Sequence, residues 1–190
     1  MQAWEIDQNF IDTCNQNVSL IAEAYKDKKP VKLKSFHNFE QFEDYWWDEF
    51  YTNFDRAYTS KQRGHYQDVI GGRVKWKYSQ NNTLPILDAL SKHLFSKVYS
   101  NHKVVCWMTW EEEDYGTDWH EDWRDEFPTY LICMNLIGNT RWQFDGYDDI
   151  YLKPGDVIAQ NGSVKHKVTP IGHQKRLTLA GHRGLSEIIL

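Results

Sequence analysis

Over residues 1 to about 100, apolar residues recur every three to four positions, which is the spacing of an amphipathic helix. This pattern predicts helices over Trp4–Tyr25, about Phe39–Tyr58 and about Leu84–Tyr99. The second of them carries a stripe of aromatic side chains, which favours packing on a sheet over a ligand groove. The polar stretch Thr59–Gln80 contains three glycines and predicts a loop, in which Val74–Tyr78 is a candidate strand.

After about residue 103 the spacing changes to that of short strands separated by turns, such as those at Asp145-Gly146 and Asn161-Gly162. The candidate strands are Lys103–Trp110, Tyr130–Ile137, Thr140–Phe144, Ile150–Leu152, Asp156–Gln160, Val164–Thr169 and Arg176–Ala180. The run Tyr130–Ile137 is apolar on both faces, as in a strand covered on both sides. Helices followed by strands predict an α+β fold, in which a helical layer packs on one sheet of a small sandwich or jelly roll.

The length of 190 residues fits one domain. We expect residues 1–102 to form a helical support region and residues 103–190 to form the β core, together in a single domain. The formal net charge of −5 argues against a nucleic-acid partner, which normally meets a basic face. No apolar run is long enough for a membrane, and Met1–Asn9 lacks Lys and Arg, so neither a membrane segment nor a signal peptide is expected. Three cysteines without a CxxC pair favour a reduced, cytoplasmic protein.

His120 and Asp122 are the first candidates for chemistry. In a strand, residues i and i+2 point to the same face, so these two side chains can aim at one point. An imidazole nitrogen and a carboxylate oxygen are two ligands of the 2-His-1-carboxylate triad of non-haem Fe(II) oxygenases. The candidate third ligand is His166, because the run VKHKV places it on one face with two valines and puts the lysines on the other. A core histidine bonded to a carbonyl is the alternative for His166.

Arg176 and Thr178 share a face of the last candidate strand, and Arg176 lies ten residues after His166. A buried arginine needs an anion, and its planar guanidinium fits a carboxylate through two parallel hydrogen bonds. The Thr178 hydroxyl can add a bond to the same carboxylate. An exposed arginine paired with a surface acid is the alternative.

These residues resemble the signature of the Fe(II)- and 2-oxoglutarate-dependent dioxygenases. That signature is His-x-Asp, a distal His several strands on, and an Arg about ten residues later that is followed at +2 by Ser or Thr. It matches this chain at His120-x-Asp122, His166 and Arg176-x-Thr178. The flanks resemble prolyl-hydroxylase-like members at Tyr115-Gly116, at Lys153-Pro154-Gly155-Asp156 and in the run HKVTP, and the resemblance covers about residues 103–183.

The same segment resembles the Jumonji and cupin-like hydroxylases at Asp122-x-x-Asp125-x-Phe127, Gly138 and Trp142. Those enzymes bind the far carboxylate of 2-oxoglutarate with a Lys about fifteen residues after the first His, where this chain has Asn135. The difference favours Arg176 as the anchor and the prolyl-hydroxylase-like arrangement.

The resemblance implies a double-stranded β-helix (jelly-roll or cupin-like) core, with the N-terminal helices packed on one sheet. It also implies that Fe(II) is held by His120, Asp122 and His166, which leaves three positions for 2-oxoglutarate and O2. The side chains expected around 2-oxoglutarate are Arg176, Thr178, Asn135 and Tyr115. The implied reaction is a hydroxylation coupled to the conversion of 2-oxoglutarate to succinate and CO2.

Candidates for the substrate pocket are Trp110, Tyr130 and His182. Residues 111–126 contain nine acids, which predicts an acidic rim and favours a basic or neutral substrate over nucleic acid. We expect a peptidyl substrate, with prolyl residues as the first candidates, or a small amino-acid-like molecule. Two other functions stay open: a metal-binding cupin enzyme that needs no 2-oxoglutarate, and a non-enzymatic barrel that binds a ligand.

Overall fold

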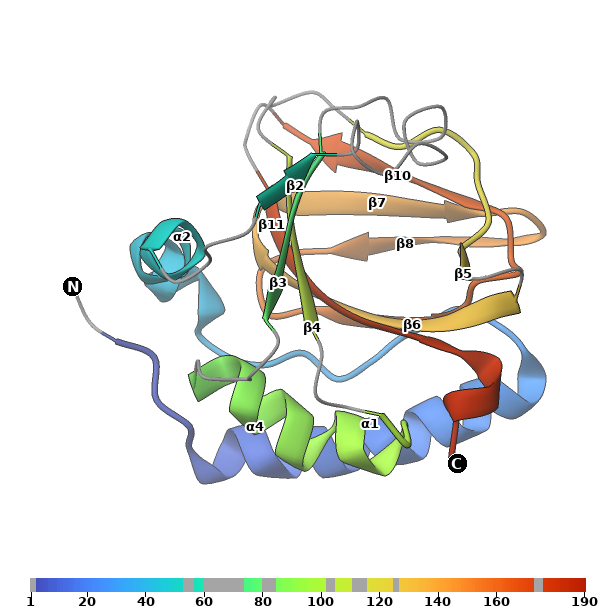
Figure 1. Ribbon diagram of the computed structural model, residues 1–190, viewed down its shortest axis with the longest axis horizontal. Coiled ribbons are helices and arrows are strands. Elements are labelled where there is room, and N and C mark those ends of the chain that lie inside the picture. Colours follow the sequence, from blue (N-terminus) through green and yellow to red (C-terminus); the bar gives the residue numbers. More distant parts are fainter. Residues whose placement is uncertain are drawn as a thin grey trace.

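The computed structural model describes residues 3–52, 57–59, 74–79, 85–101, 105–110, 116–124, 127–172 and 176–190. Within these ranges only the backbone is described at residues 50–52, 57–59, 74–79, 105–110, 123–124, 127–128 and 182. Figure 1 shows two sheets above a layer of helices, in which α1 (Gln8–Asp27) and α4 (Pro85–His93) lie side by side.

Helix α1 confirms the first predicted helix, although it begins at Gln8 instead of near Trp4. The Asp7 carboxylate accepts a hydrogen bond from the Phe10 backbone N–H at 2.7 Å, which satisfies one of the free amides of the first turn. Lys28, with a left-handed φ of 55°, ends the helix. The buried face of α1 consists of Phe10, Thr13, Cys14, Asn17, Ile21 and Ala24.

The second predicted helix is shorter than expected. A 3-10 turn, Phe39–Phe42, leads into α2 (Glu43–Thr52), and Tyr58 lies in a strand, β2 (Ala57–Thr59). That strand pairs with β3 (Val74–Ser79), which confirms the candidate strand within the polar stretch. The prediction that the helix continues to Tyr58 is wrong, because pairing with a distant strand overrides the local helical spacing.

The third predicted helix is confirmed in position and divides into two parts. After α4 the backbone leaves the helical region at Leu94, and a 3-10 turn, Phe95–Lys97, follows. None of the described helices combines the length and the apolar character that crossing a membrane requires.

The strands expected after residue 103 are all present within a few residues of their predicted positions, and β5 is an additional strand that was not expected. The remaining strands are β4 (Val105–Trp110), β5 (Trp123–Arg124), β6 (Phe127–Ile137), β7 (Asn139–Phe144), β8 (Tyr147–Leu152), β9 (Val157–Asn161), β10 (His166–Ile171) and β11 (Arg176–Gly184). A short 3-10 turn, Leu185–Glu187, follows the last of them.

The described strands form two antiparallel sheets (Figure 1). The order in the larger sheet is β1-β9-β6-β11-β4-β3-β2, where β1 is Val31–Lys32 and β5 pairs beside β6. The order in the smaller sheet is β10-β7-β8. Strands β1, β2 and β3 precede residue 102 and extend both edges of the larger sheet, so the first part of the chain is not purely helical.

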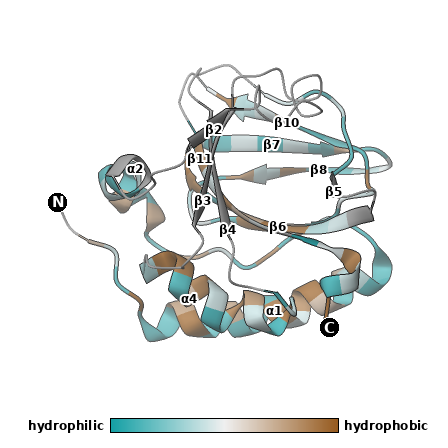
Figure 2. Cartoon of the chain, in the orientation of Figure 1, coloured by the Kyte–Doolittle hydropathy of each residue, from teal (hydrophilic) through white to brown (hydrophobic). Residues whose placement is uncertain are grey.

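An apolar core covers each face of the larger sheet. Tyr130, Ile132 and Met134 of β6 belong to a helix-side core, whereas Leu131 and Cys133 face the smaller sheet. This second, inter-sheet core consists of Leu131, Cys133, Trp142, Phe144, Leu152, Ile158, Val168 and Ala180. Hydrophobic and hydrophilic residues alternate along α1 and α4 in Figure 2, as one-sided burial of the helices requires. The strand predicted to be covered on both faces is confirmed.

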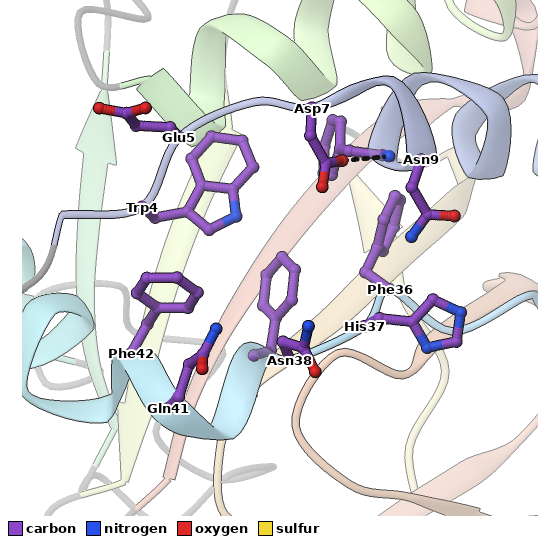
Figure 3. A pocket seen from close by; sticks show the side chains of 11 residues that line it. Trp4, Glu5, Asp7, Asn9, Phe36, His37, Asn38, Gln41 and Phe42 are labelled. Carbon is purple, nitrogen blue, oxygen red and sulfur yellow. Dashed lines mark hydrogen bonds between the residues drawn. The ribbon is translucent and has the colours of Figure 1, made fainter.

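A hollow of about 120 Å³ lies where the segment before α1 crosses the residues that lead into α2 (Figure 3). Its apolar lining comes from the helix-side core, with Trp4, Phe36 and Phe39 among its members. Figure 3 shows the Asp7 carboxylate at its rim, bonded to the first turn of α1. The hollow therefore lies on the helix side of the larger sheet and not between the two sheets.

Candidate metal centre

Three side chains converge in the space between the two sheets. One potential ligand atom from each of His120, Asp122 and His166 lies within 4.8 Å of the others. The Nε2 atom of His120 is 3.6 Å from Asp122 Oδ1, and Nε2 of His166 is 3.5 Å from Asp122 Oδ2. The convergence that the sequence predicted for these three residues is therefore present.

The backbone holds His120 directly against His166. Each residue donates its N–H to the carbonyl of the other at 2.8 Å, which forms an isolated antiparallel bridge at the start of β10. The two imidazole centroids are consequently 4.3 Å apart. The expected strand through residues 120–122 is wrong in form, because His120 makes a single bridge and Asp122 lies in irregular backbone.

Asp122 is positioned by its own main chain. Its N–H donates to the Gly162 carbonyl at 2.8 Å, and its carbonyl accepts from the Thr129 hydroxyl at 2.9 Å. A Cβ atom on residue 162 would lie 2.5 Å from the Asp122 carbonyl oxygen, so only glycine allows this close approach. The glycine of the predicted Asn161-Gly162 turn thus also allows the backbone contact that positions Asp122.

Hydrogen bonds set the tautomers of both histidines. His120 Nδ1 is 2.7 Å from the Asp118 carbonyl oxygen, and His166 Nδ1 is 2.9 Å from the Val164 carbonyl oxygen. A carbonyl only accepts, so each Nδ1 carries a proton, and in the neutral imidazole each Nε2 keeps a lone pair. Both lone pairs belong to the atoms that face Asp122. Two neutral imidazoles and a carboxylate, oriented by carbonyl groups, form a donor set that fits a divalent iron ion.

Aromatic rings enclose His166. Trp142 stacks on the imidazole with centroids 5.8 Å apart and an interplanar angle of 11°, and the Phe144 ring lies 5.9 Å away. His166 is only 1% exposed, and Asp122 is buried as well. The aromatic rings therefore shield His166 from solvent, which strengthens the electrostatic interactions that it makes.

Gln160 is a neighbour of the cluster that the sequence pattern did not indicate. Its Nε2 atom lies 3.0 Å from His166 Nε2 and 3.4 Å from Asp122 Oδ2. In the sequence it is simply the end of the candidate strand Asp156–Gln160. The available signal is its alternation with Ile158, which places an amide on an apolar face.

Arg176 and Thr178 lie on the inter-sheet face of β11, since Ala180 on the same face belongs to the inter-sheet core. Both are buried, and Arg176 is 0% exposed. Burial lowers the pKa of the Arg176 guanidinium to about 9, because the charged form loses hydration. This buried cation, with a hydroxyl on the same face, fits a carboxylate ligand.

The thiol of Cys133 connects the two halves of the site. The pKa of this thiol is raised to about 12, chiefly by burial; Thr178 and Arg176 lower it, and the Asp122 carboxylate raises it. Groups that act electrostatically on one buried atom lie in one neighbourhood. The metal cluster and the buried arginine therefore share the same interior space.

Asn135 is also buried on this side, opposite Thr178 in the register of β6 and β11. Its Nδ2 atom donates to the Gly138 carbonyl and the Thr140 hydroxyl, both at 3.2 Å, and these carbonyl and hydroxyl partners commit its amino group. The Oδ1 atom makes no hydrogen bond in the described part of the chain. The remaining hydrogen-bonding atom of Asn135 is thus an acceptor, which suits an N–H or O–H donor and not a carboxylate, and its role beside 2-oxoglutarate stays a prediction.

The prediction that Tyr130 lines the substrate pocket is wrong. Tyr130 belongs to the helix-side core, and its ring packs edge-to-face on Tyr25 of α1 at 5.2 Å. Trp110 pairs with Arg176 across β4 and β11, but its side chain, like that of His182, lies outside the described atoms. Tyr115 falls outside the described residues, so these three assignments stay predictions.

No protein-family profile matches the sequence, and no curated protein matches it. Solved structures do match the fold. A prolyl-4-hydroxylase from Pseudomonas putida is 12% identical with a TM-score of 0.61, over 88% of this chain and 98% of that one. An oxidoreductase of the 2OG-Fe(II) oxygenase family from Burkholderia pseudomallei is 13% identical with a TM-score of 0.54, over 97% and 96%.

A further match is a prolyl hydroxylase from Trichoplax adhaerens, in complex with a peptide fragment of the hypoxia inducible factor oxygen degradation domain. It is 10% identical with a TM-score of 0.59, over 93% of this chain and 91% of that one. At such identities the likeness concerns the fold. The chain therefore has the α+β, double-stranded β-helix fold of the 2OG-Fe(II) oxygenases and prolyl hydroxylases, with a His-x-Asp…His cluster between its sheets.

Proposed function

We propose that this protein is a non-haem Fe(II)- and 2-oxoglutarate-dependent oxygenase that hydroxylates its substrate. The observation that carries the proposal is the meeting of His120, Asp122 and His166, with both Nε2 lone pairs facing the carboxylate. Three protein ligands of this kind, with the other positions open, are typical of non-haem iron oxygenases. The fold supports the same conclusion, because it is the fold of known enzymes of that class.

His120, Asp122 and His166 would hold the iron. When bound, Fe(II) supplies the coupling of 2-oxoglutarate decarboxylation, which yields succinate and CO2, to oxidation of the substrate by O2. The chain contributes orientation and dryness. The carbonyls behind the imidazoles keep the rings aimed, and the aromatic wall formed by Trp142 and Phe144 excludes water.

Arg176 and Thr178 would bind the far carboxylate of 2-oxoglutarate. The guanidinium supplies parallel N–H donors that match a carboxylate, and the hydroxyl supplies another donor from the same face. Burial removes the hydration that stabilises the charge of Arg176, and a bound carboxylate would stabilise that charge in its place. This anchor distinguishes the proposed enzyme from a cupin that works without 2-oxoglutarate.

For the substrate we propose a peptide, with prolyl residues as the first candidates, or a small amino-acid-like molecule. The sequence around the cluster resembles prolyl-hydroxylase-like enzymes, and two structures of similar fold are prolyl hydroxylases. Exposed acids beside the cluster, Asp118 and Glu121, favour a neutral or basic substrate over a nucleic acid.

The test is a screen for succinate release with Fe(II), 2-oxoglutarate and O2 over peptides, free amino acids and nucleotides. We expect the strongest signal above the substrate-free background from a peptide or an amino acid, and no signal from the Asp122→Ala protein. A prolyl-peptide signal no higher than the background would remove the prolyl proposal. Equal succinate release by wild type and the Asp122→Ala protein would remove the oxygenase proposal itself.

A further inference from the structure

Gln160 is a buried amide side chain on strand β9 of the larger sheet. All five residues of β9 are buried, and alternation places Gln160 on the inter-sheet face with Ile158. Its partner across the sheet is Leu131, which belongs to the inter-sheet core. Burying an amide is unfavourable unless its polar atoms are bonded, so the surroundings of Gln160 must offer it a partner.

That partner is the metal cluster. Gln160 Nε2 lies 3.0 Å from His166 Nε2 and 3.4 Å from Asp122 Oδ2. In the neutral imidazole, which is the form that binds a metal, the Nδ1–H of His166 donates to a carbonyl and Nε2 can only accept, so the amide group is the donor. The opposite amide orientation would set two acceptors against each other, so this contact fixes which way the amide points.

A metal ion and the Gln160 N–H compete for one lone pair. The Nε2 atom of His166 has a single lone pair in the ring plane, so it cannot bind a metal and accept from Gln160 at the same time. The second acceptor within reach of the amide is Asp122 Oδ2. A carboxylate oxygen engaged by an N–H donor leaves the other oxygen, here Oδ1, as the better placed metal ligand.

We propose that Gln160 is a positioning residue that exchanges hydrogen-bond partners when the metal binds. In the metal-free protein its N–H group donates a hydrogen bond to Nε2 of His166. With the metal bound, the same group donates to Asp122 Oδ2, so that the carboxylate binds the metal through its other oxygen alone. This inference rests on the proposed metal site and adds to it a residue outside the His-x-Asp…His signature.

The first test needs no variant. Long-range 1H–15N spectra of the metal-free, full-length protein report the protonation and hydrogen bonding of each imidazole nitrogen. In the wild-type protein we expect His166 to carry its proton on Nδ1 and the Nε2 chemical shift to be that of a nitrogen that accepts a hydrogen bond. In the Gln160→Met protein the Nε2 chemical shift should move toward the value of a nitrogen with a free lone pair. A proton on Nε2, or an Nε2 signal that is the same in both proteins, would overturn the proposal.

The second test is Co(II) binding by Gln160→Met and Gln160→Leu, which keep the approximate volume and remove the donor. In the metal-bound protein these substitutions remove a hydrogen bond to the charged Asp122 carboxylate. In the metal-free protein they remove a weaker hydrogen bond to the neutral His166 ring. The metal-bound state therefore loses more stability, and metal binding weakens. We expect a loss of affinity of about tenfold, at the low end of the 10–100-fold range for such supporting residues. The visible spectrum of bound Co(II) should also change, because the carboxylate can then bind through both oxygens.

The matched control is Gln143→Leu, which makes the same chemical change at a partly exposed position of β7 that pairs with Lys167. It should bind Co(II) as wild type does. If Gln160→Met and Gln160→Leu match this control in affinity and spectrum, the role of Gln160 is overturned and the metal site stands. If His166→Ala also binds Co(II) as wild type does, the metal site itself is overturned.

Discussion

At the scale of single residues, two main-chain carbonyls determine what the histidines can do. The Asp118 and Val164 oxygens take the Nδ1 protons of His120 and His166, so that both remaining nitrogens are ready to bind a metal. The sequence predicted which side chains meet but carries no direct sign of these bonds. They arise from backbone geometry around residues 118–120 and 164–166, which depends on the bridge between distant segments.

The role of Arg176 can be separated from that of the metal ligands. Arg176→Met removes the buried cation and keeps an apolar side chain, so we expect 2-oxoglutarate affinity to fall by at least about tenfold, in line with the loss of a charge-assisted bond. Calorimetric titration of the Co(II)-loaded protein with 2-oxoglutarate measures this, and Co(II) binding itself should stay at the wild-type level. Unchanged 2-oxoglutarate affinity would favour a metal cupin that does not use this cosubstrate.

Gly162 is expected to tolerate no side chain. In Gly162→Ala the new Cβ would meet the Asp122 carbonyl oxygen at 2.5 Å and Thr129 Oγ1 at 2.7 Å, so one of them must move. Overpacking of this kind costs about 1–3 kcal/mol, and the shift of Asp122 should also weaken Co(II) binding. Thermal unfolding and a Co(II) titration measure the two effects. The control Gly184→Ala, whose Cβ would come no closer than 3.6 Å to Ser186 Oγ, should leave both at wild-type values.

Cys14 gives the stability of the protein a pH dependence above pH 9. Burial raises the pKa of its thiol from 9.0 to about 12, so the unfolded chain loses this proton first as the pH rises. Stability is therefore lost between those two values, by about 1.4 kcal/mol between pH 8 and pH 10. Urea unfolding at both pH values measures this, and the loss should be smaller by about that amount in Cys14→Ala. The same loss in both proteins would contradict the assignment.

At the scale of elements, a buried carboxylate joins β1 to the turn before β9. Asp156, with its side chain 1% exposed, accepts from Lys32 Nζ at 2.6 Å, from the Ser35 hydroxyl and from the Lys153 N–H at 2.9 Å. In the sequence, Lys153-Pro154-Gly155-Asp156 is one of the stretches that resemble prolyl-hydroxylase-like enzymes. The structure shows that the turn also anchors an edge strand of the larger sheet.

Replacing this carboxylate should loosen that edge. We expect Asp156→Asn to lower the free energy of unfolding by about 1–3 kcal/mol, because bonds to a buried charged group are weakened and the amide brings donors that face donors. The half-exposed Lys32 contributes the smaller part. Urea unfolding measures the change. The control Asp149→Asn removes a solvent-accessible pair with Arg141 and should change stability much less, so equal losses would contradict the anchoring role of Asp156.

Periodicity predicted most of the elements, and the two elements that it placed wrongly have a common cause. The helix expected to reach Tyr58 and the strand expected at residues 120–122 both depend on pairing with segments far away in the chain. Tyr130 was misplaced because a strand that is apolar on both faces gives no sign of which face meets the site. The role of Gln160 was not predicted because its one signal, the alternation with Ile158, does not show what the amide contacts.

At the scale of the whole molecule, the candidate site joins the two sheets. His166 comes from β10 of the smaller sheet, whereas Gln160 and Arg176 come from β9 and β11 of the larger one. The helices cover the opposite face of the larger sheet, so they support the site without lining it. This division explains why chemistry-bearing residues were recognisable only in the second half of the chain, although strands from the first half complete the sheet.

The proposed oxygenase function is tested most directly by anaerobic titration of the metal-free protein with Fe(II) and then 2-oxoglutarate, followed by visible absorption. In the wild-type protein we expect the weak charge-transfer band of a chelated Fe(II)–2-oxoglutarate complex at one equivalent. The band should be absent in His166→Ala. In Arg176→Met it should appear only at a much higher 2-oxoglutarate concentration. Gln143→Leu should behave as wild type. If the wild-type protein shows no band, or if His166→Ala shows the same band, the protein is not the oxygenase proposed.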